Sequence, residues 1–241
     1  MLFKESIWIR DQLEILLGQN QIQKVVNLGS SSKNFSGNQQ GYIFENIFAK
    51  LELVSQVINI DIRDELGVDL VLDFMQESSQ VVIQELQADL TLVCNLLEHL
   101  ESAELGIEAL KGITKPGSLL ILTGPRIFPF HPDPIDNRFR PTKRNLKRIL
   151  GGSFKIIEID LILGGSVLTC TSPRPAVAYK WYFSLFQMPM TLYQVRRILS
   201  ATRNLVFPAI AFACLLEKLP SEEILLNTKH KKTKLTFFNK T

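Results

Sequence analysis

The chain has 241 residues, of which 46% are apolar and 21% are charged, and its formal net charge is +3. This length and apolar content suit one large buried core, so we expect a single domain over residues 1–241. The small net charge argues against nucleic acid as the partner, because a phosphate-binding surface concentrates basic residues in a stripe.

The chain begins with a predicted amphipathic helix, MLFKESIWIRDQLEILLG, which ends at Gly18. Charged residues interrupt its apolar run, whereas a secretory signal needs an uninterrupted apolar region, so no export is predicted. Three cysteines, Cys94, Cys170 and Cys214, lie in separate apolar runs without metal-ligand spacing. They predict reduced core thiols, a cytoplasmic protein and no metal site.

Apolar runs rich in β-branched residues then alternate with helical patterns. We predict strands over residues 23–28, 57–60 and 67–74, a further strand from Ala88, and one within 115–125. Helical patterns cover residues 42–53 and 77–86, and another helix is predicted to begin near Asn95. Such alternation predicts an α/β fold, a doubly wound Rossmann-like sheet of seven strands with helices on both faces.

Polar residues follow the predicted strands at the points where they end. In open α/β sheets, ligands bind beyond the carboxyl ends of the strands, where the strand order reverses. The residues at these ends are Gly29 with Ser30 and Ser31, then Asp61, Asp73 and Asn95, and finally Gly124 with Pro125. We therefore expect a ligand site at this edge.

The loop after the first strand excludes two kinds of cofactor. A phosphate-binding loop needs a Lys followed by Ser or Thr, and a dinucleotide site needs three spaced glycines, of which only Gly29 is present. A nucleoside cofactor without phosphates remains, and Asp61 is the acid that would accept hydrogen bonds from its ribose hydroxyls.

The order of these motifs resembles the class I S-adenosylmethionine-dependent methyltransferases, of the methyltransferase type 11 kind. The matching segments are VVNLGSSS, INID, VDLVLDF, ADLTLVCNLLEHL and KPGSLLILTGP, which together cover roughly residues 22 to 125. The resemblance implies S-adenosyl-L-methionine as the cofactor. It places Gly29 and Ser30 beside the methionine part, Asp61 on the ribose, Asp73 and Phe74 on the adenine, and Asn95 with Leu96 on the floor of the site. Ser31 and Asn27 are also predicted to bind the cofactor.

The first motif departs from the family pattern. Asn27 stands where the family usually has an acid, and Ser31 and Lys33 stand where it has further glycines. Asn27 keeps a hydrogen-bonding side chain but lacks the charge that helps to hold the ammonium group of the cofactor, and Ser31 narrows the backbone approach. An alternative therefore stays open, a methyltransferase-like scaffold or binding module without cofactor. The segment 33–40 is predicted to form a lid or substrate edge.

The segment RIFPFHPDPIDNRFRPTKRNLKRIL combines four prolines between residues 129 and 141 with many ionisable groups. It follows the fifth strand and is therefore expected to lie over the carboxyl edge. We predict that His131 or Asp136 takes a proton from the acceptor, and that Arg138 and Arg140 hold an anionic group.

Two further functional predictions come from resemblance. His99 is a third catalytic candidate, because this part of the fourth motif lies beside the transferable methyl group in the resembling family. The HPDPID segment followed by FRPT resembles bacterial methyltransferases linked to polysaccharide or surface-glycan synthesis. This implies methyl transfer to oxygen or nitrogen of a small or glycan-like acceptor.

The last third of the chain predicts two strands and an insertion. Residues 154–163 are the expected sixth strand, and PAIAFACLLEK from Pro208 is the seventh, antiparallel as in the resembling family and too short to span a bilayer. Residues 178–204 are predicted to form an aromatic-rich helical insertion. It is either a core-and-surface helix or an element that faces a partner or lipid, the latter in peripheral contact with the inner membrane. The basic tail 229–241 is expected to be disordered.

Overall fold

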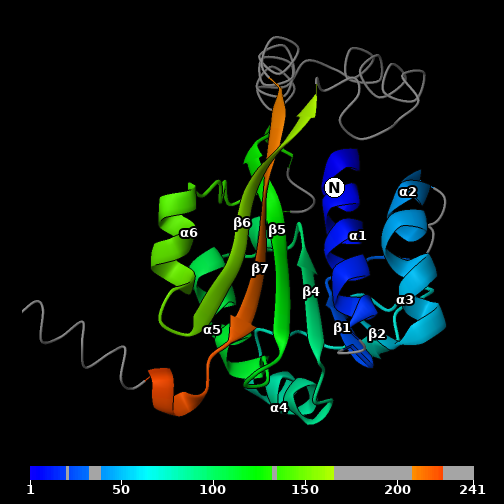
Figure 1. Ribbon diagram of the computed structural model, residues 1–241, viewed down its shortest axis with the longest axis vertical. Helices are drawn as coiled ribbons and strands as arrows, with labels where there is room; N and C mark the ends of the chain where they lie inside the picture. Colours follow the sequence, from blue (N-terminus) through cyan, green and yellow to red (C-terminus); the bar gives the residue numbers. More distant parts are fainter. Residues whose placement is uncertain (20–21, 33–38, 132–134, 166–207, 225–241) are drawn as a thin grey trace, which may run out of the picture.

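The computed structural model describes residues 1–19, 22–32, 39–131, 135–165 and 208–224. A seven-stranded sheet lies between two layers of helices (Figure 1). The elements are α1 (Phe3–Gly18), β1 (Lys24–Leu28), α2 (Gly41–Ile43), a π-helical segment (Phe44–Phe48), α3 (Ala49–Val54), β2 (Gln56–Asp61), β3 (Leu70–Val71), α4 (Glu77–Glu85), β4 (Leu90–Cys94), a 3₁₀ turn (Leu97–His99), α5 (Ala103–Ile113), β5 (Leu119–Ile127), α6 (Lys143–Leu150), β6 (Phe154–Gly165) and β7 (Ala209–Lys218).

The strand order is β3-β2-β1-β4-β5-β7-β6. The first five strands run parallel, and the order reverses between β1 and β4. β7 is antiparallel to both of its neighbours, β5 and β6 (Figure 1). This confirms the predicted doubly wound α/β sheet of seven strands with an antiparallel last strand.

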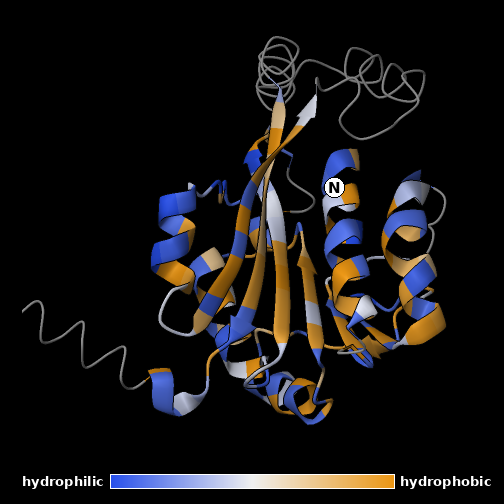
Figure 2. Cartoon of the chain, viewed as in Figure 1, coloured by the Kyte–Doolittle hydropathy of each residue, from blue (hydrophilic) through white to orange (hydrophobic). Residues whose placement is uncertain are grey.

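The core lies on both faces of the sheet, which is why its central strands are mostly apolar (Figure 2). On one face, side chains such as Leu28 pack with residues of α4, α5 and α6. On the other, side chains such as Val25 pack against α1 and the helical stretch from α2 to α3. The helices therefore cover the sheet and leave the carboxyl ends of the strands for polar groups.

The structure corrects two local predictions. The third strand pairs only at Leu70 and Val71, because the Asp69 carboxylate, just before it, accepts from the Asn59 N–H and Asp73 starts a turn. No helix begins at Asn95, whose φ of +52° breaks the helical path. The helix of this region is α5, where the Ser102 side chain accepts from Leu105 N–H.

Several predictions lie outside the described residues. The insertion 178–204 and the tail 229–241 are among them, as is most of the expected lid at 33–40. Within the described ranges, no helix is both long enough and apolar enough to cross a membrane.

Candidate active site

The turn after β1 is tightly packed around Gly29. Its backbone N–H and that of Ser30 both donate to the Ile60 carbonyl oxygen on β2, at 2.9 and 3.1 Å. Gly29 has a φ of +67°, and a Cβ at this position would lie 2.7 Å from Cδ1 of Leu96. Glycine is therefore required here both by backbone conformation and by the leucine that covers it.

Asp61, at the end of β2, is bound to this turn. Its carboxylate is 7% exposed; Oδ2 accepts from Ser31 N–H at 2.8 Å, and Oδ1 accepts from Arg63 N–H at 3.1 Å. The Arg63 guanidinium also approaches Oδ1 at 3.4 Å. The structure thus brings Gly29, Ser31 and Asp61 together, as the sequence predicts.

Asn27 lies on β1 beneath the same turn. Its Nδ2 donates to Oδ1 of Asn59 on β2 at 2.9 Å. Residues 62–69 connect β2 to β3 without a helix, and a cavity of about 350 Å³ opens on this side of the sheet. Its lining includes Asn27, Ser30, Ser31, Asn59, Asp69 and Phe48.

The remaining residues predicted to bind the cofactor have partners within the chain. Asp73 accepts from the backbone N–H of Met75 at 3.0 Å, and Phe74 is buried in the core. Asn95 donates from Nδ2 to Oε1 of the buried Glu5 on α1.

We call Asn27, Gly29, Ser30, Ser31, Asp61 and Asp73 the glycine-loop edge.

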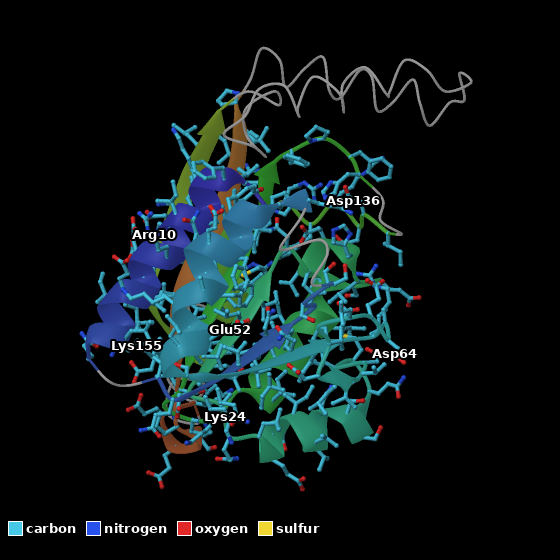
Figure 3. The ribbon with its side chains drawn as sticks, turned by 90° about the vertical axis from the view of Figure 1, so that its right-hand side faces the viewer. Arg10, Lys24, Glu52, Asp64, Asp136 and Lys155 are labelled. Carbon is cyan, nitrogen blue, oxygen red and sulfur yellow. The ribbon has the colours of Figure 1, made fainter. Side chains whose placement is uncertain are left out.

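The loop after β5 is organised by Asp136, which Figure 3 shows at the opposite end of the molecule from Lys24, the first residue of β1. The Asp136 carboxylate accepts from the backbone N–H groups of His131 and Arg138 and from the Arg140 guanidinium, at 2.8 to 3.0 Å. Burial would raise the pKa of Asp136, but these donors outweigh it and lower the pKa. In this arrangement Asp136 fixes the loop, and its low basicity suits positioning better than proton removal.

The two predicted anion-binding arginines face another cavity. Arg138 stacks over the Phe130 ring at 5.2 Å, and Arg140 pairs with Asp136. Both line a cavity of about 330 Å³ together with Arg148 and residues that begin α5. The cavity beside Ser30 and Ser31 has a separate set of lining residues.

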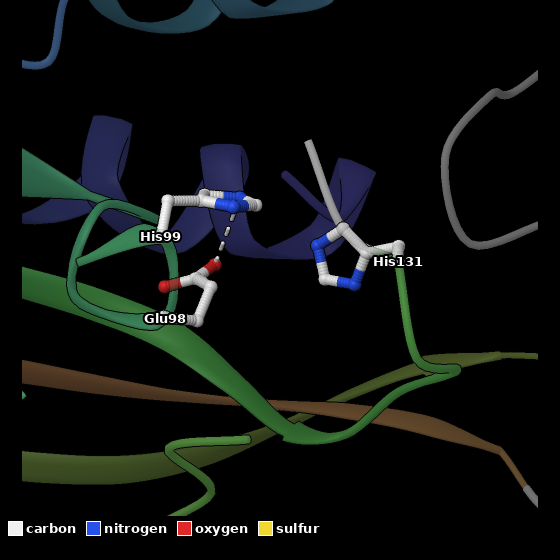
Figure 4. A group of neighbouring side chains, drawn as sticks. All are labelled: Glu98, His99 and His131. Carbon is white, nitrogen blue, oxygen red and sulfur yellow. Dashed lines mark ion pairs between the residues drawn. The ribbon is translucent and has the colours of Figure 1, made fainter. Parts of the chain in front are cut away.

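Glu98, His99 and His131 converge beyond the ends of β4 and β5, and we call them the histidine cluster (Figure 4). One ligand atom from each lies within 4.8 Å of the others. His99 Nε2 is 3.9 Å from Glu98 Oε1, and the two imidazole rings meet edge to face with centroids 5.3 Å apart. The structure therefore brings the predicted catalytic candidates His99 and His131 together.

Burial dominates the electrostatics of this cluster. It raises the pKa of Glu98 to about 7 and lowers the pKa of His131 to about 4. Glu98 is 1% exposed and was not singled out by sequence reasoning. Its one signal was an acid inside the apolar run of NLLEHL.

No family model matches the chain, and no curated protein matches it. Solved structures do. Coclaurine N-methyltransferase bound to N-methylheliamine and SAH is 14% identical, with 88% of this chain and 72% of that chain covered at a TM-score of 0.53. A Galdieria sulphuraria protein provisionally named a sarcosine dimethylglycine methyltransferase is 9% identical. The match covers 90% of this chain and 86% of that chain at a TM-score of 0.52.

The cyclase SpnF also matches, at 11% identity with 87% and 81% of the two chains covered and a TM-score of 0.50. The chain has the fold of the S-adenosylmethionine-dependent methyltransferases. At these identities the likeness concerns the fold, and a fold alone does not fix a reaction.

The glycine-loop edge fits S-adenosylmethionine in its main features. Asp61 is held at the end of β2, and within the described ranges its Oδ2 accepts one hydrogen bond, which leaves a lone pair for a ribose hydroxyl. The amide of Asn27 bonds to Asn59 and supplies no charge for an ammonium group. The residues therefore suit the nucleoside part of the cofactor better than its amino-acid part.

Proposed function

We propose that this protein is an S-adenosylmethionine-dependent methyltransferase that acts on oxygen or nitrogen of a small or glycan-like acceptor. The observation that carries the proposal is the sheet, in which β7 lies antiparallel between β5 and β6 and Asp61 ends β2 beside the Gly29 turn. The bound cofactor would supply the methyl group. Asp61 would hold its ribose, with Ser30 and Ser31 beside its methionine part.

The acceptor would lie under the loop after β5. His99 and His131 would remove or share its proton, because each ring directs Nδ1 at a backbone carbonyl and keeps Nε2 for another partner. Asp136 would orient His131, because Oδ2 of Asp136 lies 3.4 Å from Nδ1 of His131. Catalysis would come mainly from holding the nucleophile in line with the methyl carbon. Arg138 and Arg140 would bind an anionic part of the acceptor in the neighbouring cavity.

Calorimetric titration with S-adenosylhomocysteine tests the cofactor. We expect one site per chain, lost in Asp61→Ala because the ribose would lose its acceptor. Asp64→Ala is the matched control, since Asp64 is an exposed acid on the same connection (Figure 3). Absence of binding by the intact chain at millimolar ligand would reject the enzyme.

A scaffold without cofactor is the second candidate. Leu96 packs against Gly29 and reduces the space for a ligand at this turn. The Arg63 guanidinium approaches Oδ1 of Asp61 and leaves fewer lone pairs for hydrogen bonds to a ligand. The same titration separates the two functions. A scaffold would give no heat with S-adenosylhomocysteine in either the intact chain or the Asp64→Ala control.

A further inference from the structure

The Glu98 side chain is the most unusual polar group in the described part of the chain. It is 1% exposed, and neither carboxyl oxygen has a hydrogen-bond partner among the described residues. Buried carboxyl groups nearly always have partners, because loss of water without replacement is costly. Protonation would not remove the cost, since the acid O–H would still need an acceptor. The carboxyl group therefore points to a ligand.

Two imidazole rings face the same space from different elements. His99 belongs to the 3₁₀ turn after β4, and His131 to the loop after β5. β4 and β5 are parallel neighbours, paired from Leu90 with Leu119 to Cys94 with Thr123, so both segments leave the same edge of the sheet. Figure 4 shows the carboxyl group of Glu98 and the two rings grouped around one space.

The protein also fixes which nitrogen of each ring is available. His99 Nδ1 lies 2.7 Å from the Ile135 carbonyl oxygen, and His131 Nδ1 lies 3.0 Å from that of Pro129. A carbonyl oxygen only accepts, so in a neutral ring Nδ1 carries the proton and Nε2 has the lone pair. Histidine ligands of metals are held in this way by a backbone carbonyl or a carboxylate.

We propose that Glu98, His99 and His131 bind a divalent transition-metal ion. Two imidazoles and one carboxylate suit Zn²⁺, Co²⁺ or Fe²⁺, whereas Mg²⁺ and Ca²⁺ prefer ligands that are all oxygen. Three protein ligands leave a coordination position open. The side chains of His99 and His131 are 22% and 29% exposed, so that position has access to solvent.

Small movements would complete the site. Ligand atoms around a tetrahedral Zn²⁺ lie about 3.3 Å apart, from Zn–N bonds of about 2.0 Å. The three ligand atoms lie within 4.8 Å of one another, so they would need to approach by at most about 1.5 Å to reach this spacing. The sequence predicts no metal site, because His99 and His131 are 32 positions apart, have no local ligand spacing and converge only through the pairing of β4 with β5.

The ion would change the task of the two histidines. Once Nε2 binds metal it no longer takes a proton, and the open position would hold an oxygen or nitrogen of the acceptor directly. This last step rests on the proposed function, whereas metal binding does not. Titration with metal in the absence of S-adenosylhomocysteine therefore tests the site by itself, and loss of one kind of binding leaves the other measurable.

The experiment is titration of the chelator-treated full chain with Zn²⁺, followed by Co²⁺ absorption spectroscopy. We expect one Zn²⁺ per chain, and binding at least about tenfold weaker in His131→Ala, because loss of even a residue that only orients a metal ligand costs about 10- to 100-fold. His230→Ala is the matched control, because His230 is the third and last histidine and lies outside the described residues. It should bind Zn²⁺ like the intact chain.

Glu98→Gln is a second variant for the Zn²⁺ titration. If this variant does not fold, the result for His131→Ala decides whether the site exists. Visible Co²⁺ bands without thiolate charge transfer are expected, since the proposed ligands contain no sulfur. Three results would overturn the site: no Zn²⁺ binding, equal binding in His131→Ala and the intact chain, or a thiolate band with Co²⁺. Mg²⁺ that competes with Zn²⁺ at equal concentration would overturn the assigned class of ion.

Discussion

The glycine-loop edge and the histidine cluster lie at the same carboxyl edge of the sheet but differ in how their acids are satisfied. Asp61 accepts hydrogen bonds from Ser31 and Arg63, whereas Glu98 is more deeply buried and has no partner within the described ranges. The first acid stabilises a turn even without ligand. The second costs free energy until something binds it. A buried acid whose hydrogen bonds are all made within the protein can have a purely structural role, whereas one without partners points to a ligand.

The largest effect is expected at Gly29. Gly29→Ala should destabilise the protein by about 3 kcal/mol, because a left-handed residue costs about 1 kcal/mol and overpacking against Leu96 adds the rest. In a Leu96→Ala background the same change should cost only the backbone part. Urea unfolding of the double-mutant cycle measures this coupling. A cost that is unchanged by Leu96→Ala would show that the turn is not held by this leucine.

The loop after β5 supplies the next effect. Asp136→Asn should lose about 2 kcal/mol at pH 7, because three donors lose a charged acceptor. The lowered pKa means that this stabilisation is present above the unfolded value of about 4 and disappears as the pH falls through the folded pKa. Unfolding at pH 7 and at pH 3 should therefore show a smaller difference between variant and wild type in acid. A constant difference would contradict the role of the charge.

Asp61→Asn tests the satisfied acid itself. We expect a loss of about 1.5 kcal/mol, because an amide nitrogen would face the donors on Ser31 or Arg63. Asp64→Asn, at an exposed position on the same connection, should be neutral and serves as the control. Thermal unfolding without ligand is sufficient. Equal stability of the two variants would remove the contrast with Glu98.

The smallest effect has the opposite sign. With chelator present, Glu98→Leu should stabilise the protein by about 1 kcal/mol, because a buried group without partners is replaced by an apolar one. Glu98→Gln should change the free energy of unfolding little, because the glutamine amide would also be buried without hydrogen-bond partners. Urea unfolding of both variants provides the measurement. Destabilisation by Glu98→Leu would mean that the carboxyl group has a partner.

The sequence predicted the sheet because its strands are largely apolar runs such as LTLV and LLIL, which suit a sheet covered on both faces. It also placed Gly29, Asp61 and Asn95 at one edge, since each ends a parallel strand. It did not reveal that Asn95 bonds to Glu5 on α1, because helix packing across the sheet leaves no local pattern.

The histidine cluster was only partly predictable. His131 was predicted from the ionisable groups of its loop and His99 from the resemblance of the fourth motif, but their approach depends on β4 lying beside β5 and on the loop that Asp136 holds. Glu98 was not singled out, because an acid beside a histidine on a predicted helix is commonly exposed. Its burial against Gly124 and beneath the loop is a tertiary result, and so is its lack of a partner.

The position of β7 has a consequence for synthesis on the ribosome. β7 is the last strand of the described sheet to emerge, yet it fills an interior place between β5 and β6. Until β7 emerges, β5 and β6 have unpaired edges, and the apolar side chains on these strands lack their contacts with Phe212 and Leu216. Completion of this half of the fold must therefore be late and non-local, so a nascent chain stalled before residue 209 is expected to be recognised as incomplete.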